Sequence, residues 1–192
     1  MSGRKLTPDE LLAALRQLHR ARETEVREQW QRSLPLADYV VDRWERARTL
    51  GFGEGSSIYD QSLVLGEVEV GEKTWIGPGT VLDGSGGLLI GATCSISAGV
   101  QIYTHDSVRW ALSGGTAAYE RAPVRIGDHC YLGPCSIVTM GVTIGRHCLV
   151  GAHSLVNRDL PDYSIAFGVP CRIVGRVEVA DGSVKLVYTD AQ

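Results

Sequence analysis

Residues 126–156 read IGDHCYLGPCSIVTMGVTIGRHCLVGAHSLV. Every sixth position of this stretch is aliphatic: Ile126, Leu132, Val138, Ile144, Val150 and Val156. A period of six fits neither the α-helix nor the two-residue alternation of a β-strand. It fits a short strand followed by a corner, repeated so that three repeats close one turn of a triangular prism whose interior is filled by the aliphatic side chains. Such a prism has no internal pocket.

The same period extends towards the N-terminus, with one shift of two residues at Gly84-Ser85-Gly86-Gly87. These earlier repeats are Ile58, Val64, Val70, Ile76, Leu82, Ile90, Ile96 and Ile102. With the six above they make 14 repeats, which is nearly five turns. Counting in threes predicts columns of stacked strands at 58, 76, 96, 132 and 150, at 64, 82, 102, 138 and 156, and at 70, 90, 126 and 144.

Cysteines and histidines recur in the same frame. Cys94, Cys130 and Cys148 occupy one small position in successive turns, which predicts small inward residues in preference to a metal or redox role. His129 and His147 stack at a corner and are expected to face outward.

The two ends of the chain differ from the repeat. Thr7-Pro8-Asp9-Glu10 is a capping-box start, so we expect a helix over about 8–32, and after Pro35 a second over about 36–50 that places Val40, Trp44 and Ala47 on one face. Asp181-Gly182 between alternating apolar residues predicts a hairpin that caps the prism. The expected organisation is a helical segment at 1–52, a β-helix at 53–175 with a loop at 108–125, and a hairpin and tail at 176–192.

Composition excludes several classes of protein. The 192 residues carry 19 Lys and Arg against 22 Asp and Glu, a net charge of -3, with no basic stripe for nucleic acid. No apolar run approaches the roughly 18 residues of a membrane span, and the N-terminus lacks the apolar stretch of a signal peptide. Five cysteines without a disulfide spacing fit reduced thiols. We therefore expect a cytoplasmic protein with no membrane span.

One insertion interrupts the repeat just after Tyr103-Thr104-His105-Asp106. Its 18 residues, 108–125, must leave the prism as an outward loop. Long excursions from rigid scaffolds are disproportionately functional. The base of this loop, at His105, is the first place to expect chemistry.

The repeats, the loop after a histidine, the 126–156 stretch and the terminal GVPCRIVG at 168–175 together resemble the hexapeptide-repeat acyltransferases. The similarity is greatest to galactoside, maltose and nodulation-factor acetyltransferases and related enzymes of polysaccharide clusters. It implies a mainly β fold, a left-handed parallel β-helix, assembled as a homotrimer with active sites between prisms. It further implies acetyl-CoA as co-substrate, a sugar or sugar-nucleotide acceptor and no metal.

The resemblance also implies roles for individual residues. His105 matches the general base, and Asp83 and Tyr131 are expected at the acceptor. Asp106 is placed with these substrate-binding residues because it is next to His105, which it could orient, or it could simply face solvent in the loop. Asp83 could equally be a turn-forming residue before Gly84. The expected acyl-CoA contacts are Gly133, Pro134, Gly151, Ala152, Asn157, Arg158 and Arg172.

Two departures from the family pattern bear on the acceptor. Trp75 stands where galactoside enzymes have a substrate-contacting asparagine, and Tyr131 replaces a tryptophan. The first departure puts a galactoside acceptor in doubt.

Two other readings compete with the transferase. Prism-type carbonic anhydrases need two histidines five apart and a remote third, whereas His147 and His153 are six apart on different corners. A catalytically silent scaffold is the other alternative, because a fold alone never gives a function.

Overall fold

The computed structural model describes residues 5–189, in two compact units that divide between Asp42 and Arg43. The smaller unit contains α1 (Pro8–Trp30) and α2 (Leu36–Val40), and the larger begins with α3 (Arg43–Thr49). The capping box is confirmed, since the Thr7 side chain accepts from the Glu10 N–H and the Glu10 carboxylate accepts from the Thr7 N–H. No helix among the described residues is long and apolar enough to cross a membrane.

The single helix expected over about 36–50 is wrong, because Val41 is extended between α2 and α3. Tyr39 is buried in the smaller unit, where its hydroxyl accepts a hydrogen bond from the Leu34 N–H at 2.7 Å. Ala47 is buried in the core of the larger unit. Each half therefore packs within its own unit, and the predicted common face is lost, with Val40 59% exposed.

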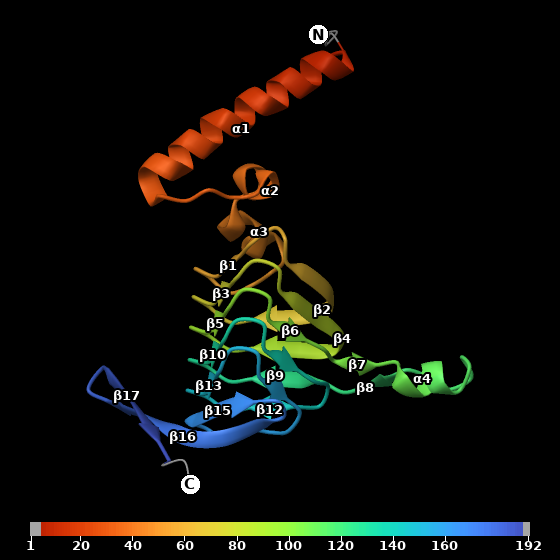
Figure 1. Cartoon of the computed structure of the whole chain (residues 1–192), viewed down its shortest axis with the longest axis vertical. Coiled ribbons are helices and arrows are strands. Elements are labelled where there is room, and N and C mark those ends of the chain that lie inside the picture. The colour runs from red at the N-terminus through yellow and green to blue at the C-terminus, as the bar shows by residue number, and fades with distance from the viewer. Residues whose placement is uncertain (1–4, 190–192) are drawn as a thin grey trace. The chain divides into compact units, whose positions relative to one another are not determined.

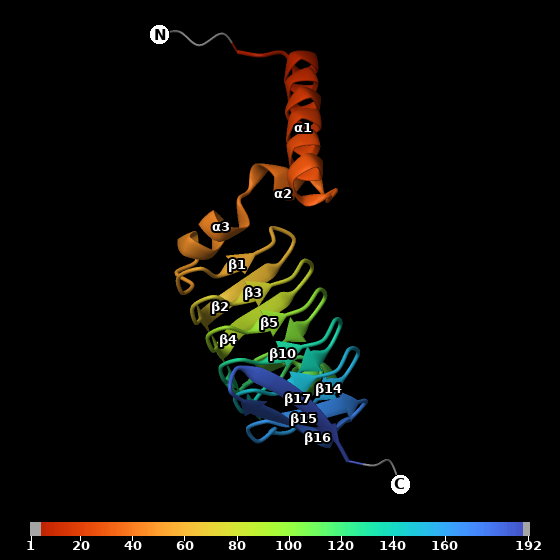
Figure 2. The ribbon, with the colours of Figure 1, turned by 90° about the vertical axis from the view of Figure 1, so that its left-hand side faces the viewer.

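The larger unit is a parallel β-helix with an outward loop, seen from two sides in Figures 1 and 2. Its first strands are β1 (Ser57–Ile58), β2 (Leu63–Val70), β3 (Trp75–Ile76), β4 (Val81–Ile90), β5 (Ser95–Ile96) and β6 (Gln101–Ile102). The loop holds β7 (His105–Asp106), α4 (Val108–Leu112) and β8 (Glu120–Arg121). The prism resumes with β9 (Val124–Ile126), β10 (Tyr131–Leu132), β11 (Ile137–Val138), β12 (Thr143–Ile144), β13 (Leu149–Val150) and β14 (Leu155–Val156). It ends in β15 (Ser164–Gly168), β16 (Cys171–Ala180) and β17 (Ser183–Tyr188).

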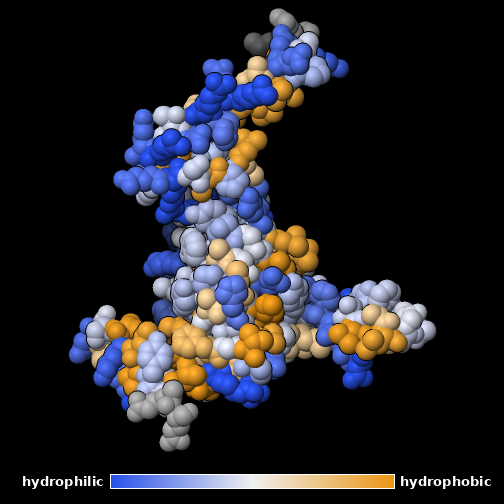
Figure 3. Space-filling view, viewed as in Figure 1, coloured by the Kyte–Doolittle hydropathy of each residue, from blue (hydrophilic) through white to orange (hydrophobic). Residues whose placement is uncertain are grey.

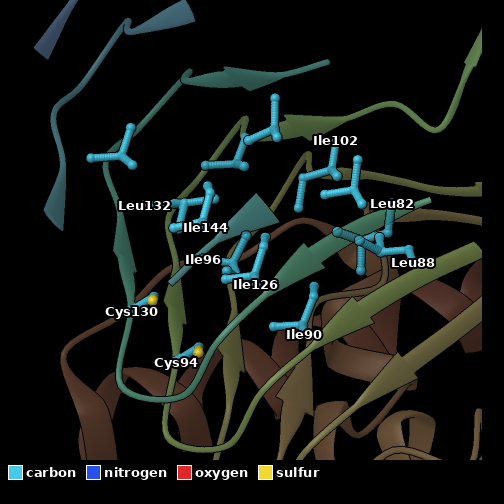
Figure 4. Packing of buried hydrophobic residues seen from close by; sticks show 14 of the residues in the cluster. Leu82, Leu88, Ile90, Cys94, Ile96, Ile102, Ile126, Cys130, Leu132 and Ile144 are labelled. Carbon is cyan, nitrogen blue, oxygen red and sulfur yellow. The ribbon is translucent and has the colours of Figure 1, made fainter. Parts of the chain in front are cut away.

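The strand register confirms all three predicted columns. On the first face β1, β3, β5, β10 and β13 stack with the inward aliphatics aligned. The second face joins the start of β2 and β4 to β6, β11 and β14, and the third joins their ends to β9 and β12. The inward side chains, from Ile58 to Val156, are 7% exposed or less apart from partly buried Val64, and they fill the axis (Figure 4).

The prism is longer than the nearly five turns expected. The first face gains a further parallel strand, β15, in which Ala166 pairs with Val150 and takes the inward position. Leu160 adds an inward residue below Ile144. These residues escape the six-residue pattern because Leu160 stands only four residues after Val156 and Ala166 is not a large aliphatic.

The stacked cysteines line one corner of the prism and also act as donors. Cys94, Cys130 and Cys148 are each 2% exposed, and their thiols reach carbonyl oxygens of the next turn at 3.3, 3.0 and 3.1 Å. Ser56 and Thr74 make the same contact higher in the column, to Gly71 and Gly91. The corner thus uses hydroxyl and thiol groups interchangeably to bond successive turns.

The hairpin at Asp181-Gly182 forms as predicted, with both residues at positive φ. β16 and β17 continue the first-face sheet in antiparallel fashion. The base of the hairpin covers the prism, since Cys171 and Val177 are buried. Its tip does not, and Val184 is 66% exposed.

Candidate active site

Asp83 and His105 meet where the loop leaves the second face. Leu82 in β4 pairs with Ile102 in β6. The residue after Leu82, Asp83, therefore lies beside the segment that leads from Ile102 to His105. The His105 Nδ1 lies 2.6 Å from the Asp83 Oδ2. The Asp83 side chain is fully buried, whereas that of His105 is 34% exposed. A buried carboxylate therefore holds a partly exposed imidazole.

Hydrogen bonds from Ser85 and Thr104 fix the Asp83 carboxylate and its backbone. Its Oδ1 accepts from the Ser85 N–H at 3.0 Å and from the Ser85 hydroxyl, and its Oδ2 accepts from the Thr104 N–H at 2.9 Å. The Thr104 hydroxyl donates to the Asp83 carbonyl at 2.8 Å. Asp83 is therefore buried and contacts His105, and its expected contact with substrate stays a prediction.

Electrostatics keeps this carboxylate ionised. Burial by itself would raise the pKa of Asp83, but hydrogen bonds from Ser85, Thr104 and His105 outweigh it and hold the pKa well below its usual range. An ionised carboxylate can only accept hydrogen bonds, so Nδ1 of a neutral His105 must carry the proton. The lone pair is then on Nε2, the nitrogen suited to take a proton from a reactant.

The glycine-rich shift in the repeat builds this arrangement. The middle of β4, between Gly84 and Leu88, bulges against Gly66 and Val68 of β2. The Gly86 N–H donates to the Thr104 hydroxyl at 2.7 Å. A Cβ on Gly86 would overlap the Thr104 carbonyl oxygen. Sequence reasoning missed Ser85 and Thr104 as partners of Asp83, although the insertion at Gly84-Ser85-Gly86-Gly87 was the signal that could have found them.

Asp106 takes a different position from His105. Its Oδ1 accepts from the Val108 N–H at the start of α4, and in the ribbon of β7 and β8 it pairs with Glu120 while His105 pairs with Arg121. Consecutive strand residues point to opposite faces. Asp106 thus contacts the backbone at the start of α4, whereas Asp83 is the carboxylate that contacts Nδ1 of His105.

Tyr131, expected at the acceptor, is 42% exposed on the first face, away from His105 within one chain. The residues expected around acyl-CoA also lie on other parts of the prism. Gly133, Pro134 and Ala152 follow strands of the first face, and the corner at Gly151 is covered by the Phe167 ring.

Arg158 and Arg172, the two arginines expected at acyl-CoA, both act electrostatically on Cys171. Burial raises the pKa of the Cys171 thiol, and the positive charges of Arg172 and Arg158 partly oppose that rise. The Arg172 guanidinium also donates a hydrogen bond to the Cys171 carbonyl at 3.0 Å. Asn157, next to Arg158, is exposed.

A shallow groove of about 390 Å³ lies on the third face and does not include His105. Leu89, Arg125, Thr143, Arg146 and Asp162 are among its lining residues. Because neither His105 nor Asp83 lines this groove, we do not assign the candidate active site to it.

Histidines outside the loop form no metal site. Within residues 5–189 no group of three or more His, Cys, Asp or Glu side chains could hold a metal ion. His147 stacks on His129 at 4.6 Å and on Tyr163 at 4.9 Å between ring centroids. His153 takes no part in this stack.

Comparison with known proteins agrees with the repeat. A model of the bacterial transferase hexapeptide (six repeats) matches residues 123–158. The chain carries the hexapeptide repeat of bacterial transferases. A hexapeptide-repeat acetyltransferase from Vibrio cholerae superposes with a TM-score of 0.61 at 25% identity, over 85% of this chain and 92% of that one. The same protein has been solved in complex with acetyl coenzyme A.

The hexapeptide-repeat chain is also similar to AntD, an N-acyltransferase from Bacillus cereus solved with dTDP and 3-hydroxybutyryl-CoA. The TM-score is 0.59 at 27% identity, over 65% of this chain and 71% of AntD. These solved relatives are CoA-binding acyltransferases by name.

Curated relatives match over shorter parts of their length. Serine acetyltransferase 2 of Arabidopsis thaliana is 31% identical over 123 residues, which are 63% of this chain and 36% of that enzyme. Galactoside O-acetyltransferase of Escherichia coli is 30% identical over 59 residues, 31% of this chain and 29% of the enzyme. The hexapeptide-repeat chain thus matches about a third of the length of these relatives.

Proposed function

We propose that this protein is an acetyl-CoA-dependent acetyltransferase that modifies a hydroxyl or amine of a sugar or sugar nucleotide, with His105 as general base. The observation that carries the proposal is the buried Asp83 carboxylate 2.6 Å from the Nδ1 of a partly exposed His105. The CoA-bound acyltransferases of the same repeat support it.

The residues divide the chemistry in a simple way. Nε2 of His105 accepts the proton of the acceptor hydroxyl or amine while the acceptor forms a bond to the thioester carbonyl carbon. Asp83 acts through His105: it fixes the tautomer and stabilises the imidazolium that forms. As the carbon–sulfur bond breaks, His105 returns the proton to the departing thiolate. Atoms and charge balance without a covalent enzyme intermediate.

The site also needs a second copy of the chain. Outward side chains of the second face form a mostly apolar column, Leu63, Val81, Gln101, Ile137 and Leu155, whereas the third face presents Glu69, Leu89, Arg125 and Thr143. We propose that the apolar column packs against a neighbouring prism in a homotrimer. A filled prism offers no internal pocket, so the cleft at His105 is formed between copies.

Acetyl-CoA is proposed to run along the neighbouring prism. Exposed Ala152, Pro134 and Asn157 allow close approach, and the cations Arg158 and Arg172 suit the phosphates of CoA. Gly133 and Gly151 keep the turns close, since a Cβ on either would overlap the next turn. Four buried free thiols support a reducing compartment, and we propose the cytoplasm.

The first test is independent of the acceptor. Thermal unfolding of the full chain is recorded with acetyl-CoA, with CoA and with a metal chelator. A ligand at 100 times its Kd adds about 2.7 kcal/mol to the free energy of unfolding, which is an easily seen shift. Stabilisation by acetyl-CoA with no effect of chelator is expected. If acetyl-CoA does not raise the melting temperature, the protein is a catalytically silent scaffold. If the chelator lowers the melting temperature, the protein belongs to the metal-dependent class.

His105→Ala tests the base itself. Because a general base contributes about a hundredfold or more, turnover should fall by at least that factor while the affinity for acetyl-CoA, measured by calorimetry, stays nearly unchanged. Turnover equal to that of the parent protein would remove His105 from the mechanism.

A further inference from the structure

The loop presents one face of its ribbon to the candidate base. β7 and β8 are antiparallel, and His105 pairs directly with Arg121. Residues directly opposite in such a pair project from the same face, with Cβ atoms about 5 Å apart. The Tyr119 ring lies on the same side, its centroid 6.5 Å from that of His105. A cation and an aromatic ring thus flank the imidazole.

Arg121 is an exposed cation without a partner. Among residues 5–189 no hydrogen bond or ion pair engages its guanidinium group. The other arginine of the loop is engaged, since Arg109 Nε lies 3.0 Å from the Glu120 carboxylate. Arg121 is therefore the loop cation available to an anionic ligand.

Two exposed aromatic rings continue this surface. Trp110 packs edge to face on Tyr119 with centroids 5.4 Å apart, and the two residues are 42% and 45% exposed. Figure 3 shows the loop projecting at the right of the molecule, mostly in pale colours with one hydrophobic cluster. Large aromatic surfaces of this kind stack on flat rings.

The surface is held in place by the root of the loop. The Ala122 N–H donates to the Thr104 carbonyl at 3.0 Å, and Cβ of Arg121 lies directly over Gly86. Thr104 also binds Asp83, so the backbone that carries Arg121 and the carboxylate that orients His105 share one support. The backbone positions of Arg121 and His105 are consequently held close to each other.

We propose that Arg121, Tyr119 and Trp110 bind the acceptor, and that the acceptor combines a phosphate with a flat ring, as a nucleoside-diphosphate sugar does. This inference rests on the proposed function and assigns its acceptor class. The Arg121 guanidinium pairs with phosphate oxygens, because its planar fork matches them. The aromatic pair stacks on the base or on the apolar face of the sugar ring, which leaves the sugar's nucleophile beside His105.

The test uses the full chain with dTDP, UDP and ADP as probes, titrated by calorimetry in the presence of CoA. At least one nucleotide should bind the parent protein, and Arg121→Ala should weaken that binding by about tenfold or more. Arg125→Ala, which removes an equally exposed arginine from the third face, is the matched control and should bind as the parent does. Tyr119→Ala should weaken binding, and Tyr119→Phe should restore it.

Pyrophosphate and methyl α-glucopyranoside separate the two parts of the ligand. Pyrophosphate binding should depend on Arg121, and glycoside binding should depend on Tyr119. Nucleotide binding that is equal in the Arg121 and Arg125 variants, or absent from the parent protein, overturns the proposal. Acetyl-CoA is titrated in parallel: if it binds while the nucleotides do not, only the acceptor class fails, and if it does not bind, the proposed function itself fails.

Discussion

At the scale of single residues, Asp83 shows how burial decides a role. Asp83 is followed by Gly84, as a turn residue would be. Its separation from His105 along the sequence also matches that of a substrate ligand. Full burial and hydrogen bonds to both oxygens support the proposal that it positions His105. Because the folded pKa is depressed, the stability that Asp83 contributes is present above about pH 4, its ordinary range, and is lost as the pH falls below it.

Asp83→Asn tests that role. Either orientation of the amide places its NH₂ against a backbone donor, the Ser85 N–H or the Thr104 N–H, and the negative charge that stabilises the His105 imidazolium is lost. Turnover is expected to fall by about a hundredfold or more, while calorimetry with acetyl-CoA gives an unchanged Kd. A variant with the parent's turnover and pH profile would show that the carboxylate does not act through His105.

At the scale of elements, the stack of His129, His147 and Tyr163 along one corner has a pH dependence of its own. Burial, then the charges of His129 and Arg146, lower the pKa of His147, against the opposing effect of Asp162 and Asp128. Below pH 6.5, His147 is therefore protonated more fully in the unfolded chain than in the folded protein. Stability is full above the unfolded pKa of about 6.5 and declines as the pH falls through the window below it.

His147→Asn isolates this contribution. Asparagine tolerates the positive φ of 54° found at this position and does not titrate. Tm measured between pH 7.5 and 5.5, above the range of the carboxylates, should depend less on pH in the variant than in the parent. Identical slopes would assign the pH dependence to other groups.

At the scale of the whole molecule, the division between Asp42 and Arg43 predicts which truncation folds. Removal of residues 1–42 should leave a soluble, cooperatively melting protein. Removal of 1–50 also deletes buried Ala47 and Arg46, whose guanidinium donates to the Ser62 carbonyl at 2.7 Å. That longer truncation should have a clearly lower Tm. Equal melting of the two proteins would show that α3 adds nothing to the prism.

The proposed trimer is tested on its apolar column. Leu155→Asp places a charge where we expect a neighbouring prism, so light scattering should report monomers, and turnover should fall with the loss of the shared cleft. Thr143→Asp, the same change on the polar third face, should remain trimeric. A trimeric Leu155→Asp protein would place the interface elsewhere.

The amino-acid sequence by itself determined the prism, its three columns and the position of its outward loop. It could do so because a filled, narrow interior demands an aliphatic residue at each sixth position, and that demand is local and periodic. The sequence also singled out His105, because an insertion in a regular solenoid must leave the prism outward and His105 stands at the base of this insertion.

Only the tertiary structure decided what surrounds His105 and where the chain divides. The column shared by Leu82 and Ile102 predicts that the strands leading to Asp83 and His105 are neighbours. Ser85, Thr104 and Arg121 join them through a bulge and a returning ribbon, and such contacts between distant segments leave no period in the sequence. The break at Val41 has the same origin, because Tyr39 and Ala47 are buried in different units. Local pattern fixes the repeat, whereas burial and long-range hydrogen bonds select the partners of its polar residues.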